Sequence, residues 1–303
     1  MSTSGERGAG LVVATYNIHA GVDGWGRPFD VADRCRQLNA DILVIQECWA
    51  PDDEGGIAEQ VAAALGYEVA GTAALARGRL AEPDPAPGAG WGPVRWGHDR
   101  GRLAEAIRLD DAGRQSARRV TRPAVRGRWQ LVVLSRLPVS RSRIHPLPRA
   151  ANDPAARAVV TVDVTVGGTP VTVSGVHLAH LRQRSLRQLR DLRRHLAPHR
   201  GGAAVLCGDM NLWGPAVEAA LPGWRRAVVG PTWPAWRPRH QIDHVLVAGD
   251  VAPAGGGPVP VAGSDHLPLR AELLVGRAGG GRSGSTNGRS GPDGDKGSDD
   301  RRT

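Results

Sequence analysis

The sequence has little of several residue types, and each shortage excludes a class of protein. Its three cysteines, Cys35, Cys48 and Cys207, form no CxxC pair and no Cys/His cluster, so they indicate buried thiols rather than a disulfide framework or a zinc site. No run approaches the roughly 18 apolar residues that a membrane-spanning helix needs. The N-terminus, MSTSGERGAG, lacks the charged and then apolar layout of a secretion signal, and we therefore expect a cytoplasmic protein without a membrane span.

Lysine is almost absent from this chain. Lys296 is the only one, so arginine carries nearly all of the positive charge behind a formal net charge of +9. Such a charge favours polyanionic partners, for example nucleic acid or phosphoinositide headgroups. A coding sequence rich in G and C would favour arginine as well, and the charge alone therefore does not identify a partner.

The chain divides by composition into a folded body and two ends. Its 303 residues, 41% of them hydrophobic, are enough to bury a substantial core. Residues 276–303 are glycine, serine, arginine and aspartate with almost no aliphatic side chain, which predicts a disordered tail. We expect residues 1–9 to be flexible and residues 10–275 to form one folded domain, present as a monomer.

Short runs rich in β-branched residues alternate with helical patterns, as in an α/β protein. The predicted strands are 11–17, 41–47, 130–136, 158–166, 170–178, 203–209 and 242–247, and the predicted helices are about 30–39, 56–66, 181–197 and 214–221. A Gly-Gly pair between 158–166 and 170–178 suggests an antiparallel hairpin, which disfavours a purely parallel sheet. Residues 72–126 lack periodicity and read as long surface loops around one short helix near 102–109.

Polar side chains recur where the hydrophobic strands end. Asn17, Glu47 and His177 each close a predicted strand, and Asp209 and Asn211 end the run AVLCGDMN. One such residue is usually a turn or a helix cap, but five at one end of a layered sheet indicate a site.

A cluster of carboxylates at that end would need a positive charge. If Glu47, Asp209 and Asp265 converge, their repulsion at about 4 Å is on the order of 4 kcal/mol per pair at an effective dielectric of about 20. Carboxylate and amide oxygens suit hard cations, so the sequence predicts Mg²⁺, with Mn²⁺ as the alternative. Phosphate chemistry follows, because such a cation neutralises charge that develops on phosphoryl oxygens.

Six segments, in order and in spacing, resemble the motifs of the endonuclease/exonuclease/phosphatase superfamily. They are VVATYNIHAG, DILVIQE, SGVHL, CGDMN, QIDHVLV and GSDHLPL, spread over residues 10–275. The resemblance implies a four-layered α/β sandwich in which two mixed sheets pack together, as in pancreatic deoxyribonuclease, with the active site at one rim.

The resemblance also implies a role for each residue. Glu47 is expected to be the principal metal ligand, with Asn17 beside it and Asp265 as a further contact. Asp209 is expected to orient or deprotonate the attacking water, Asn211 to hold the phosphate or the metal, and His177 to contact the phosphate. Asp243 and His266 resemble a hydrogen-bonded pair in which the carboxylate fixes the imidazole, so that the histidine stabilises the phosphoryl group or moves a proton. His244 should face away from the site, and His19 should lie at the surface or in packing.

Differences from better-known branches of this superfamily exclude some substrate classes but do not identify the substrate. The only tyrosines are Tyr16 and Tyr67, so the mid-chain tyrosine of abasic-site endonucleases is missing, and Asp243-His244 replaces the Asp-Arg pair of inositol-polyphosphate 5-phosphatases. The leading hypothesis is a nuclease-like phosphodiesterase. A phosphatase or a phospholipase C-like enzyme on lipid headgroups is the second, and a catalytically silent relative that binds nucleic acid or membrane is the third.

Two further patterns bear on the substrate. Tryptophans lie near the motifs at Trp25, Trp49, Trp213, Trp233 and Trp236, where they could stack on bases or pack at the rim. The stretch LRQRSLRQLRDLRRHL is an amphipathic helix with an arginine face that includes Arg182, Arg187, Arg190 and Arg194. A solvated surface and a contact with nucleic acid or an anionic membrane both remain open for that face.

Overall fold

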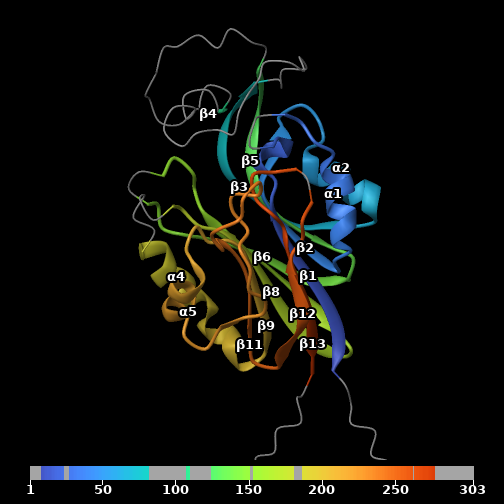
Figure 1. Cartoon of the computed structure of the whole chain (residues 1–303), viewed down its shortest axis with the longest axis vertical. Helices are drawn as coiled ribbons and strands as arrows, with labels where there is room; N and C mark the ends of the chain where they lie inside the picture. Colours follow the sequence, from blue (N-terminus) through green and yellow to red (C-terminus); the bar gives the residue numbers. More distant parts are fainter. Residues whose placement is uncertain are drawn as a thin grey trace, which may run out of the picture.

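The computed structural model describes the body of the chain in seven stretches. They are residues 8–23, 27–81, 107–109, 124–150, 153–180, 186–261 and 263–276. The expectations for the two ends, a flexible 1–9 and a disordered 276–303, lie outside these stretches apart from Gly8, Ala9 and Gly276. Ala9 pairs with Val275, so the first and last strands of the body lie side by side (Figure 1).

Two mixed β-sheets form the centre of the protein. The first has the order β12 (Val251–Pro258), β13 (Leu269–Val275), β1 (Ala9–Asn17), β2 (Ile42–Pro51), β5 (Ala124–Ser135), β3 (Glu68–Ala81) and β4 (Ile107–Leu109). The second has the order β10 (Arg225–Arg226), β11 (Asp243–Ala248), β9 (Ala203–Asp209), β8 (Thr169–His177), β7 (Ala158–Val166) and β6 (Val139–Pro146). The pairs β1–β2 and β8–β9 are parallel and the remaining pairs are antiparallel, so both sheets are mixed.

Helices cover the outer faces of the two sheets. They are η1 (His19–Gly21), α1 (Val31–Leu38), α2 (Ile57–Leu65), α4 (Leu186–Leu196), η3 (Ala197–Gly201) and α5 (Gly214–Ala220). Figure 1 shows α1 and α2 on one side of the sheets and α4 and α5 on the other. The predicted four-layered α/β sandwich is therefore confirmed. Among the described residues, no helix combines the length and the apolar character needed to cross a bilayer.

Alternation along the strands builds the core in separate layers. In β2, Ile42 and Val44 face the second sheet, while Leu43 and Ile45 pack under α1 and α2. The second sheet divides its side chains in the same way between the first sheet and the helices α4 and α5. Because both faces are buried, the central strands are continuous apolar runs, which is why they were visible in the sequence.

The seven predicted strands and four predicted helices all occur, with small changes at their ends. The predicted antiparallel hairpin is confirmed, since β7 and β8 pair from Val159 and Val176 to Val166 and Thr169. For the helix predicted at 181–197, residues 181–185 and Arg182 with them lie outside the described stretches, and α4 covers Leu186–Leu196.

The interpretation of residues 72–126 as loops around a helix is wrong wherever the structure describes it. Strand β3 continues to Ala81 and pairs antiparallel with β5, which begins at Ala124. Ile107–Leu109, inside the expected helix, is a strand paired with β3. The residues between these strands lie outside the described part of the chain. Alanine, glycine and arginine have little intrinsic preference for strands, and β3 is instead held by its neighbour β5.

Gly175 allows the two sheets to approach closely just before the strand ends at His177. A Cβ atom at Gly175 would lie 2.7 Å from Val44 Cγ1 and 3.1 Å from Val133 Cγ2, both on the first sheet. Valine has few rotamers in a strand, so neither side chain can move aside without strain. The sheets therefore have no room for a methyl group at this position.

We predict that Gly175→Ala lowers the free energy of unfolding by about 1–3 kcal/mol, the usual cost of overpacking a core. Urea denaturation monitored by tryptophan fluorescence measures the change. Gly10→Ala in β1 is the control, because a Cβ there meets no atom within 4 Å. A Gly175→Ala protein as stable as this control would contradict the close packing of the sheets.

Candidate active site

The strand registers bring the predicted site residues to one rim of the sandwich. In the first sheet, Asn17 at the end of β1 lies opposite Gln46 of β2. In the second sheet, Asp209 lies opposite His177 on one side and opposite Asp243 on the other. The polar ends of both sheets therefore meet where the hydrophobic core stops.

Asn17 joins the two sheets. Its Nδ2 donates to Asp209 Oδ2 at 3.1 Å across the gap between the sheets, and to Glu47 Oε1 at 3.3 Å within its own sheet. Its Oδ1 accepts from the backbone N–H of His19 at 3.1 Å. Both Nδ2 and Oδ1 of this buried amide are thus hydrogen-bonded. The position of Asn17 therefore fixes the two carboxylates relative to each other.

Glu47 owes its orientation to a β-bulge. The register between β2 and β5 shifts between Ile45 and Cys48, and Glu47 has a φ of +52°, in the left-handed region. A bulge redirects a side chain, and the Glu47 side chain is 28% exposed in an otherwise buried strand. His19 and Asn211 also have positive φ values of 46° and 51°, so strained backbone gathers at this rim, as is common at functional sites.

Asp209 lies at the centre of the cluster and is buried. Its Oδ1 accepts from the backbone N–H of Asn211 at 2.8 Å, and its Oδ2 lies 3.6 Å from His177 Nε2 and 4.0 Å from His266 Nε2. Burial, followed by repulsion from Asp243, raises the pKa of Asp209 to about 7. The nearby donors oppose this shift without cancelling it, so an ionised Asp209 is poorly solvated and lies beside a second carboxylate, Asp243.

His177 is a neutral histidine at neutral pH. Burial holds its pKa well below the usual value, and the positive charges of Arg157 and His266 lower it further. Its Nε2 lies between Asp209 and Glu47, at 3.6 Å and 3.9 Å from their nearest oxygens. A neutral imidazole in this place can donate a hydrogen bond but adds no charge to the site.

Asp243 and His266 form the predicted hydrogen-bonded pair. Asp243 Oδ2 lies 2.9 Å from His266 Nδ1, and both side chains are buried. Burial lowers the pKa of His266, but the charges of Asp243 and Asp265 outweigh it and hold the pKa well above its usual value. His266 is therefore an imidazolium whose Nε2 faces Asp209.

Asp265 completes the rim next to η1. Its Oδ1 lies 3.8 Å from His19 Nδ1 and accepts from Ser264 Oγ at 3.3 Å, and its Oδ2 accepts from Trp233 Nε1 at 3.4 Å. Although burial raises the pKa of Asp265, the positive charges of His19 and His266 lower it overall. This carboxylate is therefore ionised. It is also partly exposed, whereas Asp209 is buried.

The cluster fits a divalent cation. Asp243 Oδ1 is buried and finds no hydrogen-bond partner in the described part of the chain. The raised pKa of Asp209 shows that its neighbours do not fully stabilise the ionised carboxylate. Ligand atoms of Asp209, Asp243 and His266 all lie within 4.8 Å of one another. A protonated His266 has no lone pair to offer, so the oxygens of the surrounding carboxylates and of Asn17 are the better donors for a hard cation.

All eight residues predicted from the sequence lie in this one network. Asn211 joins it through its backbone, and its Nδ2 donates to Leu178 O at 3.0 Å. His244 faces away as predicted: its Nε2 lies 2.7 Å from Leu212 O, behind the second sheet. His19 was expected at the surface or in packing, but it lies beside Asp265, because the backbone turn of η1 directs it back toward the rim.

Sequence reasoning missed Arg157 and Thr232, and it named Trp233 only as a tryptophan that could stack on a base or pack at the rim. Arg157 donates to the buried Asp153 at 2.7 Å, and its charge acts on His177. Thr232 Oγ1 accepts from the backbone N–H of Asp243 at 3.3 Å, and Trp233 contacts Asp265. Arg157 was one arginine among many, and no pattern distinguished it. Only its partner, four residues earlier in the chain, hinted at a fixed position.

The tryptophans near the motifs divide into packed and exposed residues. Trp49 is buried against Trp129 with ring centroids 5.7 Å apart, which confirms the packing alternative for this residue. Trp213 and Trp236 are 59% and 38% exposed. Trp25 lies outside the described residues. Trp233 is half-buried and donates to Asp265 at the rim. Stacking on a substrate stays open for the exposed Trp213 and Trp236.

Comparisons with known proteins agree with this fold. The model of the endonuclease/exonuclease/phosphatase family matches residues 14–266. A solved endonuclease/exonuclease/phosphatase from Beutenbergia cavernae is 22% identical, with a TM-score of 0.60 over 88% of this chain and 72% of that one. A family protein from Bacteroides thetaiotaomicron is 14% identical, with a TM-score of 0.57 over 89% of this chain and 100% of that one. A mannosyl-6-phosphatase from the same organism is 15% identical, with a TM-score of 0.55 over 87% of this chain and 99% of that one. A comparison with curated protein sequences found no match.

Two packed mixed sheets with helices on both outer faces define an α/β sandwich protein. Because the family model covers more than half of its length, the chain belongs to the endonuclease/exonuclease/phosphatase family. Members of this family are generally metal-dependent hydrolases of phosphoesters. The solved structures are less than 25% identical to the chain, and they establish the fold alone.

The raised pKa of the buried Asp209 predicts an unusual effect on the stability of the metal-free protein. The folded-state pKa of about 7 exceeds the unfolded value of 3.8, so this group stabilises the fold below pH 3.8, and the contribution is lost as the pH rises through about 7. We therefore predict that, in EDTA at about pH 8, Asp209→Asn melts at a higher temperature than the parent, by roughly 2–4 °C for each kcal/mol gained.

Differential scanning calorimetry from acid to alkaline pH measures this effect. Asp250→Asn removes an exposed carboxylate and is the matched control, with no expected change. Added Mg²⁺ should stabilise the parent more than Asp209→Asn, because the variant lacks one of the carboxylates that a cation at the rim would balance. An Asp209→Asn protein that melts at or below the parent at alkaline pH would contradict the raised pKa of Asp209.

Proposed function

We propose that this protein is a divalent-metal-dependent phosphodiesterase of nuclease-like type. The observation that supports it most is the environment of Asp209. This carboxylate is buried, its pKa is raised to about 7, and it is surrounded by the donors Asn17, His177 and His266. A base with a pKa near neutrality, next to groups able to hold a phosphate, is what water activation requires.

Glu47, Asn17 and Asp265 are the residues that we propose hold the metal. Both Glu47 and Asp265 bring a partly exposed carboxylate to the rim. Asn17 is hydrogen-bonded to Glu47. Oxygen donors of this kind favour Mg²⁺, with Mn²⁺ as a substitute. A bound cation would supply charge neutralisation on the phosphoryl oxygens and polarise phosphorus toward attack.

Asp209 is proposed to orient the attacking water and accept its proton. The bond from the Asn211 backbone N–H fixes Oδ1, and the bond from Asn17 fixes Oδ2, so the carboxylate is held at both oxygens before substrate binds. His177 and the side chain of Asn211 are proposed to contact the phosphate as neutral donors. Preorganised donors of this kind stabilise charge that develops in the transition state without reorganisation.

The Asp243–His266 pair is proposed to stabilise the phosphoryl group or to move a proton. Asp243 holds Nδ1 of the ring, which leaves Nε2 free to face the site, 4.0 Å from Asp209. A cationic ring there stabilises negative charge on a phosphoryl oxygen and can donate a proton to the leaving group. Thr232, which anchors the backbone of Asp243, acts only by positioning.

The substrate class is the open part of the proposal. A nucleic-acid phosphodiester agrees with the net charge of +9. A phosphomonoester, as the name of the similar mannosyl-6-phosphatase suggests for that protein, and a lipid headgroup are the alternatives within the enzyme hypothesis. The complete set of motif residues at one rim disfavours a catalytically silent relative. Three free and buried cysteines fit the proposed cytoplasmic location, and a monomer is proposed with it.

We predict that the protein hydrolyses bis-p-nitrophenyl phosphate in the presence of Mg²⁺ and that EDTA abolishes the reaction. Asp209→Asn should lower kcat by about 10²–10⁴-fold, the usual contribution of a general base. Release of p-nitrophenolate measures the rate, and Asp250→Asn is again the matched control. Activity that persists in EDTA, or an Asp209→Asn enzyme as fast as the parent, would refute the proposed mechanism.

Glu47→Gln separates metal binding from proton transfer. The substitution keeps the size of the side chain and removes its charge, so the Mg²⁺ concentration for half-maximal rate should rise by at least about 10–100-fold. Saturating Mg²⁺ should restore part of the rate, in contrast to Asp209→Asn. An unchanged Mg²⁺ dependence would show that Glu47 is not a ligand.

The same assay with a panel of substrates identifies the class. Single-stranded DNA, RNA, a sugar phosphate, sphingomyelin and phosphoinositides cover the alternatives. The proposal predicts the highest kcat/KM for a nucleic acid. A higher value for the sugar phosphate or for a lipid would replace the nuclease-like assignment and leave the metal-dependent chemistry in place.

A further inference from the structure

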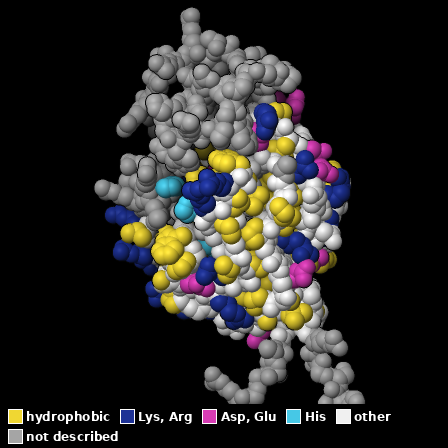
Figure 2. All heavy atoms as spheres, in the orientation of Figure 1, with side chains coloured by type: hydrophobic (Ala, Val, Ile, Leu, Met, Phe, Trp, Pro, Cys, Tyr) yellow, Lys and Arg dark blue, Asp and Glu magenta, His cyan; other side chains and the backbone are white. Residues whose placement is uncertain are grey.

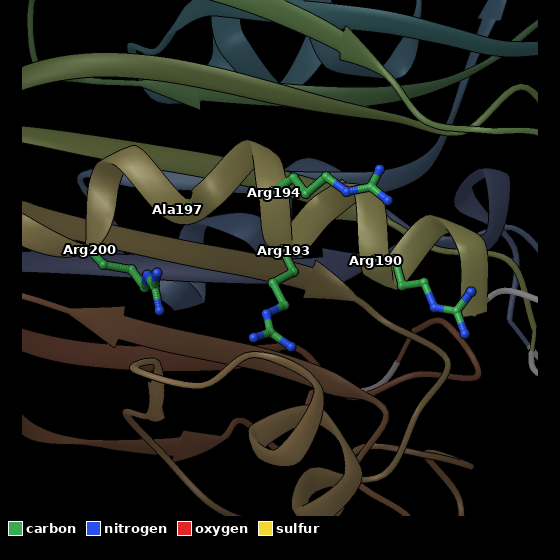
Figure 3. Close-up of a pocket in the computed structure, with 5 residues that line it drawn as sticks. All are labelled: Arg190, Arg193, Arg194, Ala197 and Arg200. Carbon is green, nitrogen blue, oxygen red and sulfur yellow. The ribbon is translucent and has the colours of Figure 1, made fainter.

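A concave, strongly basic surface lies on α4 and η3, outside the candidate active site. Four arginines and one alanine line a depression of about 340 Å³, which we call the arginine groove: Arg190, Arg193, Arg194, Ala197 and Arg200. Figure 3 shows the four guanidinium groups projecting from successive turns of α4 and from η3. In Figure 2, dark-blue side chains gather along the edge of the molecule that α4 occupies in Figure 1.

The groove is not needed to hold α4 on the sheet. Leu189, Leu192 and Leu196 of α4 are buried in the cluster behind the second sheet, and the lining arginines are exposed. Two of them, Arg193 and Arg194, lie in the last helical turn, where the helix dipole favours a positive charge. The same preference applies to Arg200 in the last turn of η3, but it does not explain Arg190 or why the arginines surround a hollow.

The positive charge of the groove is largely unbalanced. Arg194 lies 3.4 Å from Asp191, but this carboxylate also contacts His145 at 2.8 Å. Arg200 donates to the carbonyl oxygen of Pro222 at 3.0 Å, a neutral partner. Neither Arg190 nor Arg193 has an ion-pair partner among the described residues. Like charges gathered without counter-charges create a local potential that attracts anions.

We propose that the arginine groove binds the phosphate backbone of a nucleic-acid strand. A guanidinium group presents a planar fork that matches a phosphate, and four of them lie along α4 and η3. A chain of phosphates is therefore complementary to the groove in charge. Lysine, the compact alternative for holding phosphate, is absent from residues 1–295 of the chain.

A nucleic acid fits better than a membrane surface. A helix that enters a bilayer interface does so with its apolar face, and that face of α4 is buried against the sheet. The groove is hollow and contains no large apolar side chain. A flat membrane could touch its rim only, whereas a strand of nucleic acid can follow its length.

The position of the groove relates it to the candidate active site without making it part of that site. Helix α4 begins nine residues after His177, the last residue of β8, and leads away from the rim along the outer face of the second sheet. None of the four lining arginines belongs to the catalytic network. Binding in the groove should therefore need neither a metal nor hydrolysis, and it can be tested separately from the proposed activity.

The test is fluorescence anisotropy in EDTA with a labelled single-stranded DNA of about 20 nucleotides, long enough to pass over the groove. Removing Arg190, Arg193 and Arg194 together (R190Q/R193Q/R194Q) should weaken DNA binding at least about tenfold at about 0.1 M salt. The slope of log K against log salt should become less steep by about 2, because three phosphate contacts at about 0.7 each are lost.

A matched variant, R36Q/R77Q/R79Q, removes three exposed arginines from α1 and β3, which belong to the first sheet and the helices that cover it. Each triple variant takes three positive charges from the net charge of +9. The control should lose less than about threefold in affinity with its salt slope nearly unchanged, since charges beyond about 10 Å are screened. Both triple variants should hydrolyse bis-p-nitrophenyl phosphate at the rate of the parent, which separates this inference from the proposed function.

Three outcomes would overturn the inference. Equal loss in the two triple variants would show that only net charge matters. Absence of binding by the parent protein would exclude a nucleic-acid site. Binding of the parent to phosphatidylserine vesicles that is lost in R190Q/R193Q/R194Q, with DNA binding unchanged, would assign the groove to membranes. If the triple variant melts below the parent, Arg193→Gln alone should still flatten the salt slope by about 0.7.

Discussion

The hydrogen bond between Asn17 and Asp209 is the interaction on which the candidate site depends. It joins the ends of β1 and β9, which belong to different sheets and are 192 residues apart in the chain. Glu47 and His19 are placed through Asn17, and His177, Asn211 and Asp243 are placed through Asp209. His266 follows through its bond to Asp243, and Asp265 lies beside His19. The bond can form only because the sheets pack closely, as the contact of Gly175 with Val44 and Val133 shows. Packing of the core and chemistry of the rim are therefore one problem in this fold.

Electrostatics gives the site its character. Carboxylates from both sheets meet in a place where burial leaves them poorly solvated, and the result is a high pKa at Asp209 and a cationic His266 held between two acids. Such an arrangement destabilises the metal-free protein and favours a cation. The arginine groove shows the opposite imbalance on the outside of the second sheet, with positive charge in surplus. The two features together suit a protein that handles phosphate groups at more than one position along a chain.

Much of the fold and of the site could be predicted from the sequence, for identifiable reasons. Strands such as Ile42–Pro51 and Ala203–Asp209 are buried on both faces, so they are visible as apolar runs, and the polar residues that end them mark the rim. Strand β3 was missed because its alanines and glycines show no strand preference and it depends on pairing with β5. The bulge at Glu47 and the turn that brings His19 to Asp265 follow from backbone conformations with positive φ, which no residue type in those segments announces. Arg157 was missed because its partner Asp153 gains meaning only when both are buried.

The central claim is that Asp209 directs a water molecule to phosphorus in a metal-dependent reaction. Hydrolysis of bis-p-nitrophenyl phosphate in ¹⁸O-labelled water, followed by mass spectrometry of both products, tests it most directly. The account predicts one ¹⁸O atom in p-nitrophenyl phosphate, none in p-nitrophenol, and loss of the labelled product in EDTA and in Asp209→Asn. Label in p-nitrophenol, or labelled phosphate ester formed equally by Asp209→Asn, would contradict it.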